Sequence, residues 1–310
     1  MKTFLAMTKR NIKLFFRDKG LFFTSMITPI ILLILYATFL ANVYRDSFSS
    51  SIPPEILETM PKDLVNGTVA AQLFAALLSV CTVTVAFCSN TIMAQDKVCG
   101  ARKDFTITPV RKSTLALSYY FGTLATTLIV TFLATAVSLL YIATQGWYYT
   151  AWDVVRLFLD VLLLTTFGTA LSSVVNRFLT TQGQISAVGT MVSAGYGFIC
   201  GAYMPISQFG KGLQNALSFL PGTYATSLLK NDALSGALAE MGKSIPPEEM
   251  ERIRRVMDCS PEFFGTRVSV FAMVMIVLVA TLLCTGLYLL LFSAKKPHKK
   301  AGKSAENSGR

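Results

Sequence analysis

Residues 69–94 read VAAQLFAALLSVCTVTVAFCSNTIMA, and residues 95–112, which follow directly, read QDKVCGARKDFTITPVRK. The first stretch contains no charged side chain, whereas the second is rich in charge. A helix needs about 20 apolar residues to cross a hydrocarbon core of about 30 Å, and the first stretch is long enough. It therefore predicts a membrane-spanning helix that ends in a charged loop.

The rest of the chain repeats this pattern. It is 53% hydrophobic and 15% charged, with a mean hydropathy of +0.53, which is typical of a membrane protein. The apolar runs are continuous and do not alternate with polar residues, so helices are predicted in place of barrel strands. We expect an all-α, polytopic fold with six transmembrane helices near residues 21–41, 69–94, 114–144, 154–175, 185–204 and 268–292.

Basic residues predict the orientation of these spans. With six spans both termini lie on one side, and that side receives 18 of the 28 Lys and Arg residues, most of them in the N-terminal segment, the loop 95–112 and the C-terminal tail. The positive-inside rule then places both termini in the cytosol. The protein is expected to be a multi-pass protein of the cell membrane, either a bacterial inner membrane or a plasma membrane. The net charge of +11 is thus interpreted as a topology signal, and no nucleic-acid partner is expected.

Few residues could carry catalytic chemistry. The six cysteines are scattered without a CxxC motif, and His298 is the single histidine, so no metal site is expected. The GKS at residues 242–244 lacks the glycine spacing of a phosphate-binding loop. The sequence therefore predicts a transport protein that binds no cofactor of its own and is not an enzyme.

The two ends of the chain are predicted to lie outside the bilayer. Residues 2–18 place basic side chains on one side of a helix and apolar ones on the other, which predicts an interfacial helix on the inner leaflet; a basic flank that only fixes topology is the alternative. Residues 1–294 are expected to form the permease domain. Residues 295–310 are expected to form a basic, disordered cytosolic tail.

The fifth span carries small residues at every fourth position, a pattern that lets helices approach closely in lipid. They are Gly189, Ser193, Gly197 and Gly201. The helix that packs against them could belong to this chain or to a second copy. After this span, Pro205 and Pro221 bracket two semi-apolar pieces, each too short to cross, which predicts a re-entrant helix pair or a pair lying flat on the outer leaflet.

Arg156 and Asp160 are the charged residues within the predicted spans, and they lie four apart near the outer end of the fourth span. This spacing predicts an ion pair. An interfacial pair with the arginine extended outward is one interpretation, and a role in substrate binding or gating is the other.

Within the loop 95–112, residues 100–107 are predicted to be helical, and Thr108, which precedes Pro109, is expected to end the helix. The segment offers charge and apolar contact together, which suits a docking site for a cytosolic protein. The alternative is an ordinary solvated loop. The residues predicted to contact this cytosolic protein, and so to couple it to the spans, are Arg102, Lys103, Asp104, Phe105, Thr106, Ile107 and Pro109.

The chain resembles the permease subunit of type-2 ATP-binding-cassette (ABC) exporters from residue 1 to about residue 292. The stretches that carry the resemblance are KDFTITPVRKS and MPISQFGKGLQNALSFLPGTYA, together with the order of the spans. The family's acidic pair and Gly-Thr step correspond here to QDKVCGA, in which Asp96 stands for one acid, Gly100 for the glycine and Ala101 for the threonine.

The resemblance implies two permease copies, here a homodimer or a pair of similar chains, working with two copies of a separate ATPase that binds ATP and Mg. It further implies that residues 102–109 form a coupling helix and that the segment after span five closes the outer side. The gate residues expected there are Pro205, Phe219, Pro221 and Tyr224.

These features together favour an ABC exporter permease for a drug, lipid, peptide or polysaccharide. An ion-coupled secondary transporter is one alternative, and it would depend on Asp160. A membrane scaffold that transports nothing is the other.

Overall fold

The computed structural model describes residues 1–36, 39, 41–50, 52 and 60–293. The tail predicted over residues 295–310 and part of the C-terminal end of the first predicted span lie outside the described residues. The first half of the described chain contains α1 (Lys2–Arg17), α2 (Lys19–Leu35), α3 (Ala41–Ser50), α5 (Lys62–Val98), α6 (Ala101–Ile107) and α7 (Lys112–Gln145).

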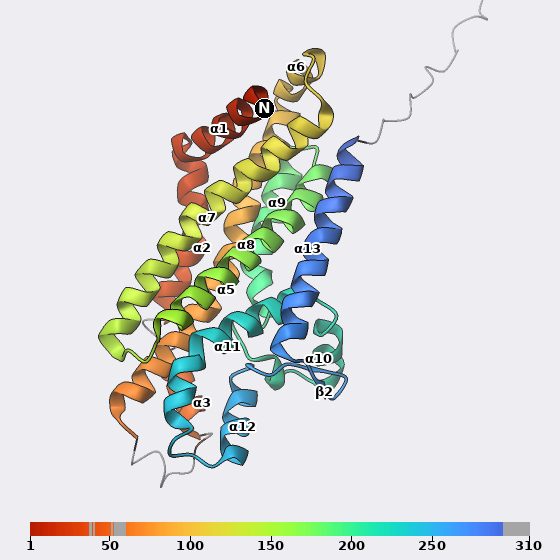
Figure 1. Ribbon diagram of the computed structural model, residues 1–310. Coiled ribbons are helices and arrows are strands. Elements are labelled where there is room, and N and C mark those ends of the chain that lie inside the picture. Colours follow the sequence, from red (N-terminus) through yellow and green to blue (C-terminus); the bar gives the residue numbers. More distant parts are fainter. Residues whose placement is uncertain (37–38, 40, 51, 53–59, 294–310) are drawn as a thin grey trace, which may run out of the picture.

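The second half contains α8 (Ala151–Phe178), α9 (Gln182–Ile199), the short 3-10 turn η2 (Ile206–Gln208), α10 (Lys211–Leu217), α11 (Pro221–Met241), α12 (Pro247–Val256), β1 (Glu262–Phe263), β2 (Thr266–Arg267) and α13 (Val270–Ser293). The two strands form a small antiparallel hairpin. The fold is therefore all-α in its bundle, as predicted (Figure 1).

Helix α5 is the centre of the bundle. It packs against α2, α7, α8, α9 and α11, and its most apolar stretch is completely buried. Gly168 of α8 allows a close crossing, because a side-chain carbon built there would lie 2.7 Å from the Thr82 carbonyl oxygen of α5. The amide of Asn90 donates to the hydroxyls of Ser172 and Ser173, at 3.1 and 2.9 Å. Close backbone approach and interhelical hydrogen bonds hold helices together where lipid removes the hydrophobic driving force.

Four helices of the described chain are long and apolar enough to cross a membrane: α5, α7, α8 and α13. A fifth span results if α1 and α2, which meet at a bend of 72°, are counted as one. The prediction of six spans is therefore not confirmed. Helix α9, which covers most of the fifth predicted span, has only 18 residues and includes two glutamines and several glycines, which lower its hydropathy.

The segment after α9 differs from the two short pieces predicted. The first piece forms only η2 and the seven-residue α10. The second begins with Pro221 in its first turn and forms a helix of 21 residues, α11, which packs against α5, α8 and α13. A re-entrant pair of equal helices is not confirmed. Because α11 is buried by its neighbours, it is part of the bundle itself.

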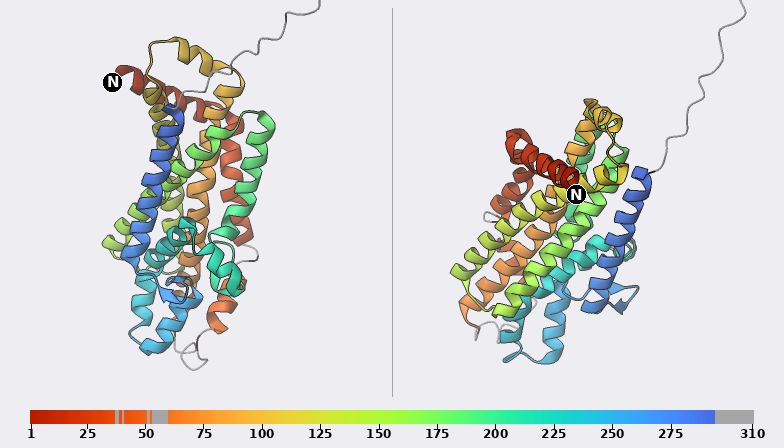
Figure 2. Two further views of the ribbon diagram at one scale, coloured as in Figure 1. Left: turned by 90° about the vertical axis from the view of Figure 1, so that its right-hand side faces the viewer. Right: turned by 45° about the horizontal axis from the view of Figure 1, so that its top comes forward.

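The bundle has two distinct ends. Helix α1 lies across one end, where α6 and the last turn of α13 are also found, and we call this the α6 end (Figure 2). The opposite end carries α3, α10, α12 and the hairpin, and we call it the α12 end (Figure 1). In α12, Glu248 and Glu249 lie in the first turn and Arg254 and Arg255 in the last, an order that the helix dipole favours.

Candidate functional site

Helix α6 projects from the α6 end of the bundle (Figure 1). Gly100 enters it with φ 87°, a left-handed conformation that glycine adopts without strain, and this reverses the chain after α5. At the other end Thr108 is extended, with φ −82° and ψ 156°, as expected before a proline. Lys103, Asp104 and Pro109 are exposed, and Ile107 is 84% exposed. The exposed face of α6 therefore carries both charged side chains and one apolar side chain.

Two cation–π contacts join α6 to the bundle. The guanidinium carbon of Arg102 lies 4.4 Å from the ring centre of Phe292 at the end of α13. The guanidinium carbon of Arg10 in α1 lies 5.1 Å from the ring centre of Phe105. Burial lowers the pKa of the Arg102 guanidinium, which remains charged at neutral pH. A displacement of α6 would therefore act on both α1 and α13.

A partly buried ion pair joins α1 to α5 directly behind α6. Arg10 donates two hydrogen bonds to the Asp96 carboxylate, at 2.7 and 2.9 Å, and the Tyr119 hydroxyl of α7 donates a third at 2.7 Å. The neighbouring Asn11 amide donates to the Ser118 carbonyl oxygen at 3.1 Å. Bidentate arginine–carboxylate pairs have a defined geometry. The three helices are therefore fixed relative to one another where α6 joins them.

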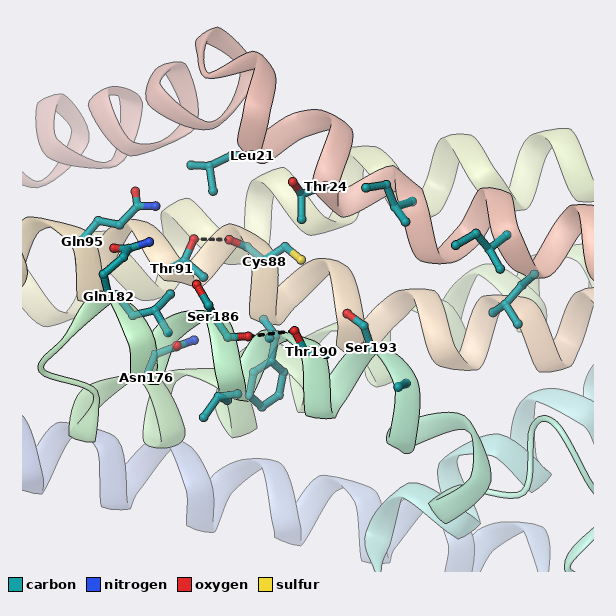
Figure 3. A pocket seen from close by; sticks show the side chains of 18 of the residues that line it. Leu21, Thr24, Cys88, Thr91, Gln95, Asn176, Gln182, Ser186, Thr190 and Ser193 are labelled. Carbon is teal, nitrogen blue, oxygen red and sulfur yellow. Dashed lines mark hydrogen bonds between the residues drawn. The ribbon is translucent and has the colours of Figure 1, made fainter.

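A lateral groove of about 880 Å³ runs between α2 and α9, with α5 as its floor. It is mostly apolar, and none of the described residues that line it is charged. Figure 3 shows Gln95, Asn176 and Gln182 toward one end of this groove, with Thr24 and Ser193 on facing helices farther along. The groove thus has an amide-rich end near α6 and apolar walls beyond it.

The amide-rich end retains unused hydrogen-bonding capacity. Asn176 is 2% exposed, and its Nδ2 atom has no hydrogen-bond partner among the described residues. By contrast, the Thr91 and Thr190 hydroxyls donate to carbonyls of their own helices, those of Cys88 and Ser186 (Figure 3). A buried amide left without an acceptor is costly, so Asn176 is suited to donate to a ligand in the groove.

A second cavity of about 320 Å³ lies toward the α12 end, among α3, α5 and the segment after α9. Phe198 and Tyr203 line both this outer cavity and the groove. Their rings pack edge to face, with centroids 4.9 Å apart. This aromatic pair therefore forms a boundary shared by the two cavities.

Of the predicted gate residues, only Pro205 lines the outer cavity. Phe219 is exposed and packs against Phe263 and Phe264 of the hairpin. Pro221 starts α11, and Tyr224 is buried with its hydroxyl donating to the Ser218 carbonyl at 2.6 Å. The four residues are thus not gathered at one constriction.

The four small residues predicted for helix packing also separate. Gly189 and Ser193 line the groove, and a side-chain carbon built at Gly189 would meet no atom within 4 Å. At Gly197 it would lie 2.2 Å from the Tyr203 ring of the same chain, and Gly201 has φ 74° beside Ile206. The nearest neighbour at the last two positions is therefore the chain itself, whereas Gly189 faces open space.

The predicted ion pair between Arg156 and Asp160 is not formed. Arg156 pairs with Asp153, three residues earlier on α8, and its other nitrogen lies 3.9 Å from Asp232 of α11. Asp153 competes better than Asp160 for Arg156, because the Asp153 carboxylate is held in a capping box with Thr150 and accepts a hydrogen bond from Ser235. Asp160 instead lies within hydrogen-bond reach of Asp232.

A buried charge pair lies at the α12 end. Lys230 of α11 is completely buried, and its ammonium donates to the Gly201 carbonyl at 2.8 Å and to Asp258 at 3.4 Å. Asp258 has a positive φ of 54° and also accepts from the Ile206 amide at 2.8 Å. Close by, burial raises the pKa of the Cys259 thiol to about 12. These contacts join α11, the segment after α9 and the loop after α12.

A comparison with family models decides the class. The model of the ABC-2 type transporter matches residues 2–231, which is most of the chain. The chain belongs to the ABC-2 type transporter family. Members of this family are non-catalytic membrane subunits of ABC transporters, so the chain has a permease role in transport. A search of curated proteins finds no relative that matches it.

Sequence reasoning predicted the short helix α6 of this ABC-2 permease but missed its contacts with other helices. Arg10, Tyr119 and Phe292 each contact the α6 region from a distant part of the sequence. At the other end, the role of Lys230 was missed because its partner Asp258 is 28 residues away. A lysine inside a largely apolar helix is the signal that could have found it. Among the described residues no group of three or more His, Cys, Asp or Glu side chains could hold a metal ion.

Proposed function

We propose that this ABC-2 permease exports an amphipathic molecule and is driven by a separate ATPase that docks on α6. In this proposal two permease copies pair with two ATPase subunits, and ATP and Mg bind to the ATPases. The α6 end with both termini faces the cytosol. ATP binding closes the motor and moves α6, which shifts the spans between inward and outward access.

The contacts of α6 carry this proposal. The helix is exposed on the side that a partner would contact, and on the other side it holds α1 through Phe105 and α13 through Arg102. An ordinary solvated loop would not require two cation–π contacts to separate helices. The basic residues around α6, α1 and the last span support a cytosolic position.

The groove supports an amphipathic cargo. Its walls are apolar and uncharged, and its end near α6 offers amides, including the unpaired Nδ2 of Asn176. Such a site fits a molecule with an apolar body and a hydrogen-bond acceptor at its head, such as a lipid or a hydrophobic drug. A polysaccharide would require many more polar groups. The open side, between α2 and α9, is where we place the second permease copy.

The aromatic pair of Phe198 and Tyr203 replaces the predicted gate in this proposal. Because both rings border the groove and the outer cavity, moving them would join the two spaces. The segment after α9 still closes the outer side in this proposal. Phe219 and Tyr224 do not line the gate; they hold this segment in place.

The decisive experiment is to purify the permease together with its ATPase and to replace Lys103, Asp104 and Phe105 of α6 by alanine at once. We expect the ATPase to lose its stimulation by the permease and transport to stop, while the permease remains folded. The matched control is Lys243→Ala combined with Glu240→Ala, an exposed pair at the α12 end. Unchanged stimulation and transport in the triple variant would discard the assignment of α6.

A further inference from the structure

Asp160 and Asp232 face each other between α8 and α11. Asp160 is 6% exposed and Asp232 is 5% exposed, so neither carboxyl group is in bulk water. The two carboxyl groups lie within hydrogen-bond reach. Two ionised carboxylates at this separation have no proton to share and repel each other, and one proton held between them would relieve the repulsion.

The surrounding charges do not neutralise the pair. Arg156 is the nearest cation, but Asp153 already holds it, and its distance to Asp232 is 3.9 Å. Oδ2 of Asp160 has no hydrogen-bond partner among the described residues. One arginine among three aspartates leaves excess negative charge at a site shielded from water. A bound proton would reduce this charge.

The other helices around α8 offer no further charge. Residues 64–95 of α5, residues 113–145 of α7 and all of α13 contain no Asp, Glu, Lys or Arg. Cys81 of α5 belongs to the apolar cluster that contains Val161 of α8. The Tyr149 hydroxyl, from the loop before α8, already donates to the Ala233 carbonyl of α11.

We expect Asp160 to lie below the membrane surface, because it falls within the candidate span α8. Trp147 and Trp152 are exposed near the start of α8, as in the aromatic belts found at membrane interfaces. Asp160 follows Trp152 by eight residues, about 12 Å along the helix. A charge at this depth is costly, and intramembrane carboxyl groups commonly serve as proton sites.

We propose that Asp160 and Asp232 form a proton-binding site that joins α8 to α11. With one proton bound, the carboxyl of one residue donates to the carboxylate of the other, and the two helices are held together. Loss of the proton leaves two like charges in contact and drives the helices apart. Because α11 carries Lys230 of the outer charge pair, protonation would then control how firmly the α12 end is closed.

The test uses the permease alone in lipid nanodiscs, so its outcome does not depend on any ATPase. Infrared difference spectra taken across a pH change should show the carbonyl band of a neutral carboxylic acid at neutral pH. The band should be lost in Asp160→Asn and in Asp232→Asn. An amide can still donate to the remaining carboxylate, so both variants should fold. The control, Asp46→Asn at an exposed position, should keep the band.

Thermal unfolding of the same samples gives a second readout. If the folded protein holds a proton that the unfolded chain releases, stability falls as pH rises through the range in which the pair loses it. We expect this fall in the wild type and in Asp46→Asn, and a flatter pH dependence in Asp160→Asn. Absence of the acid band in the wild type would overturn the proposal. If Na⁺ stabilises the wild type but not Asp160→Asn, and the wild type shows no acid band, the site binds a metal cation. That result would also overturn the proposal.

Discussion

The two ends of the molecule use charge in different ways. At the α6 end, Arg10 of the main ion pair remains about one third exposed, and the cations next to α6 contact aromatic rings. At the α12 end, Lys230 is fully buried and paired with a carboxylate in a left-handed turn. A pair that can reach water can rearrange at low cost, whereas a sealed pair cannot. We therefore expect the charge pair at the α6 end to rearrange more easily than the sealed pair at the α12 end.

The largest effect is expected from breaking the sealed pair. Asp258→Asn retains a side chain that tolerates a positive φ but leaves the Lys230 ammonium buried without a counterion. Breaking a buried pair in this way costs about 3–5 kcal/mol. Hydrogen exchange of residues 247–267 in nanodiscs should rise sharply.

Adding Lys230→Met to Asp258→Asn provides the control, because it removes the stranded charge and retains the volume. The double variant should recover much of the protection against hydrogen exchange that Asp258→Asn loses. If exchange in Asp258→Asn matches the wild type, the α12 end is not held by this pair, and the contrast between the two ends is lost.

A smaller effect is expected at the α6 end from Asp96→Asn. The substitution removes the carboxylate that accepts from Arg10 and Tyr119, but Arg10 can turn toward water, so we expect a loss of about 2–3 kcal/mol. Hydrogen exchange should rise in α1, residues 2–17. Asp104→Asn on the exposed face of α6 is the matched control and should leave α1 unchanged.

The middle of the bundle can be tested with two glycines. Gly168→Ala should cost about 1–3 kcal/mol, because the new methyl group meets the backbone of α5, which cannot move aside. Gly189→Ala meets nothing and should raise helix stability by up to about 1 kcal/mol. Unfolding midpoints of the two variants provide the measurement. Equal midpoints would contradict the close crossing of α5 and α8.

The smallest effect on stability is expected for Phe292→Leu. It removes the ring beneath Arg102 but keeps most of the apolar volume, so the loss should be about 0.5–1 kcal/mol. Coupling should suffer more than stability, because α6 loses its contact with α13. The measurement is the ratio of transport to ATP hydrolysis, with Leu290→Ala at an exposed site of α13 as the control. A ratio equal to that of the wild type would remove α13 from the coupling route.

The sequence predicted the all-α membrane class and a helix at residues 100–107, which the structure shows at Ala101–Ile107. Both predictions depend on local signals: long apolar runs, a glycine and a proline. The six spans that the sequence predicted are not confirmed, because α9 is free of charge but not strongly apolar. It paired Arg156 with Asp160 by helical spacing, but the capping box at Thr150 placed Asp153 closer. Contact partners such as Asp232, Asp258 and Phe292 come from segments far away in the sequence. Which distant segments meet in the fold cannot be derived from a single sequence.

We infer that this ABC-2 permease transports only when a separate motor acts through α6. The most direct measurement is cargo accumulation against a gradient in vesicles that contain ATP and either the permease alone, the permease with its ATPase, or the triple α6 variant with the ATPase. The account predicts accumulation only in the second preparation. Uphill accumulation by the permease alone, or by the triple variant at the wild-type rate, would contradict it.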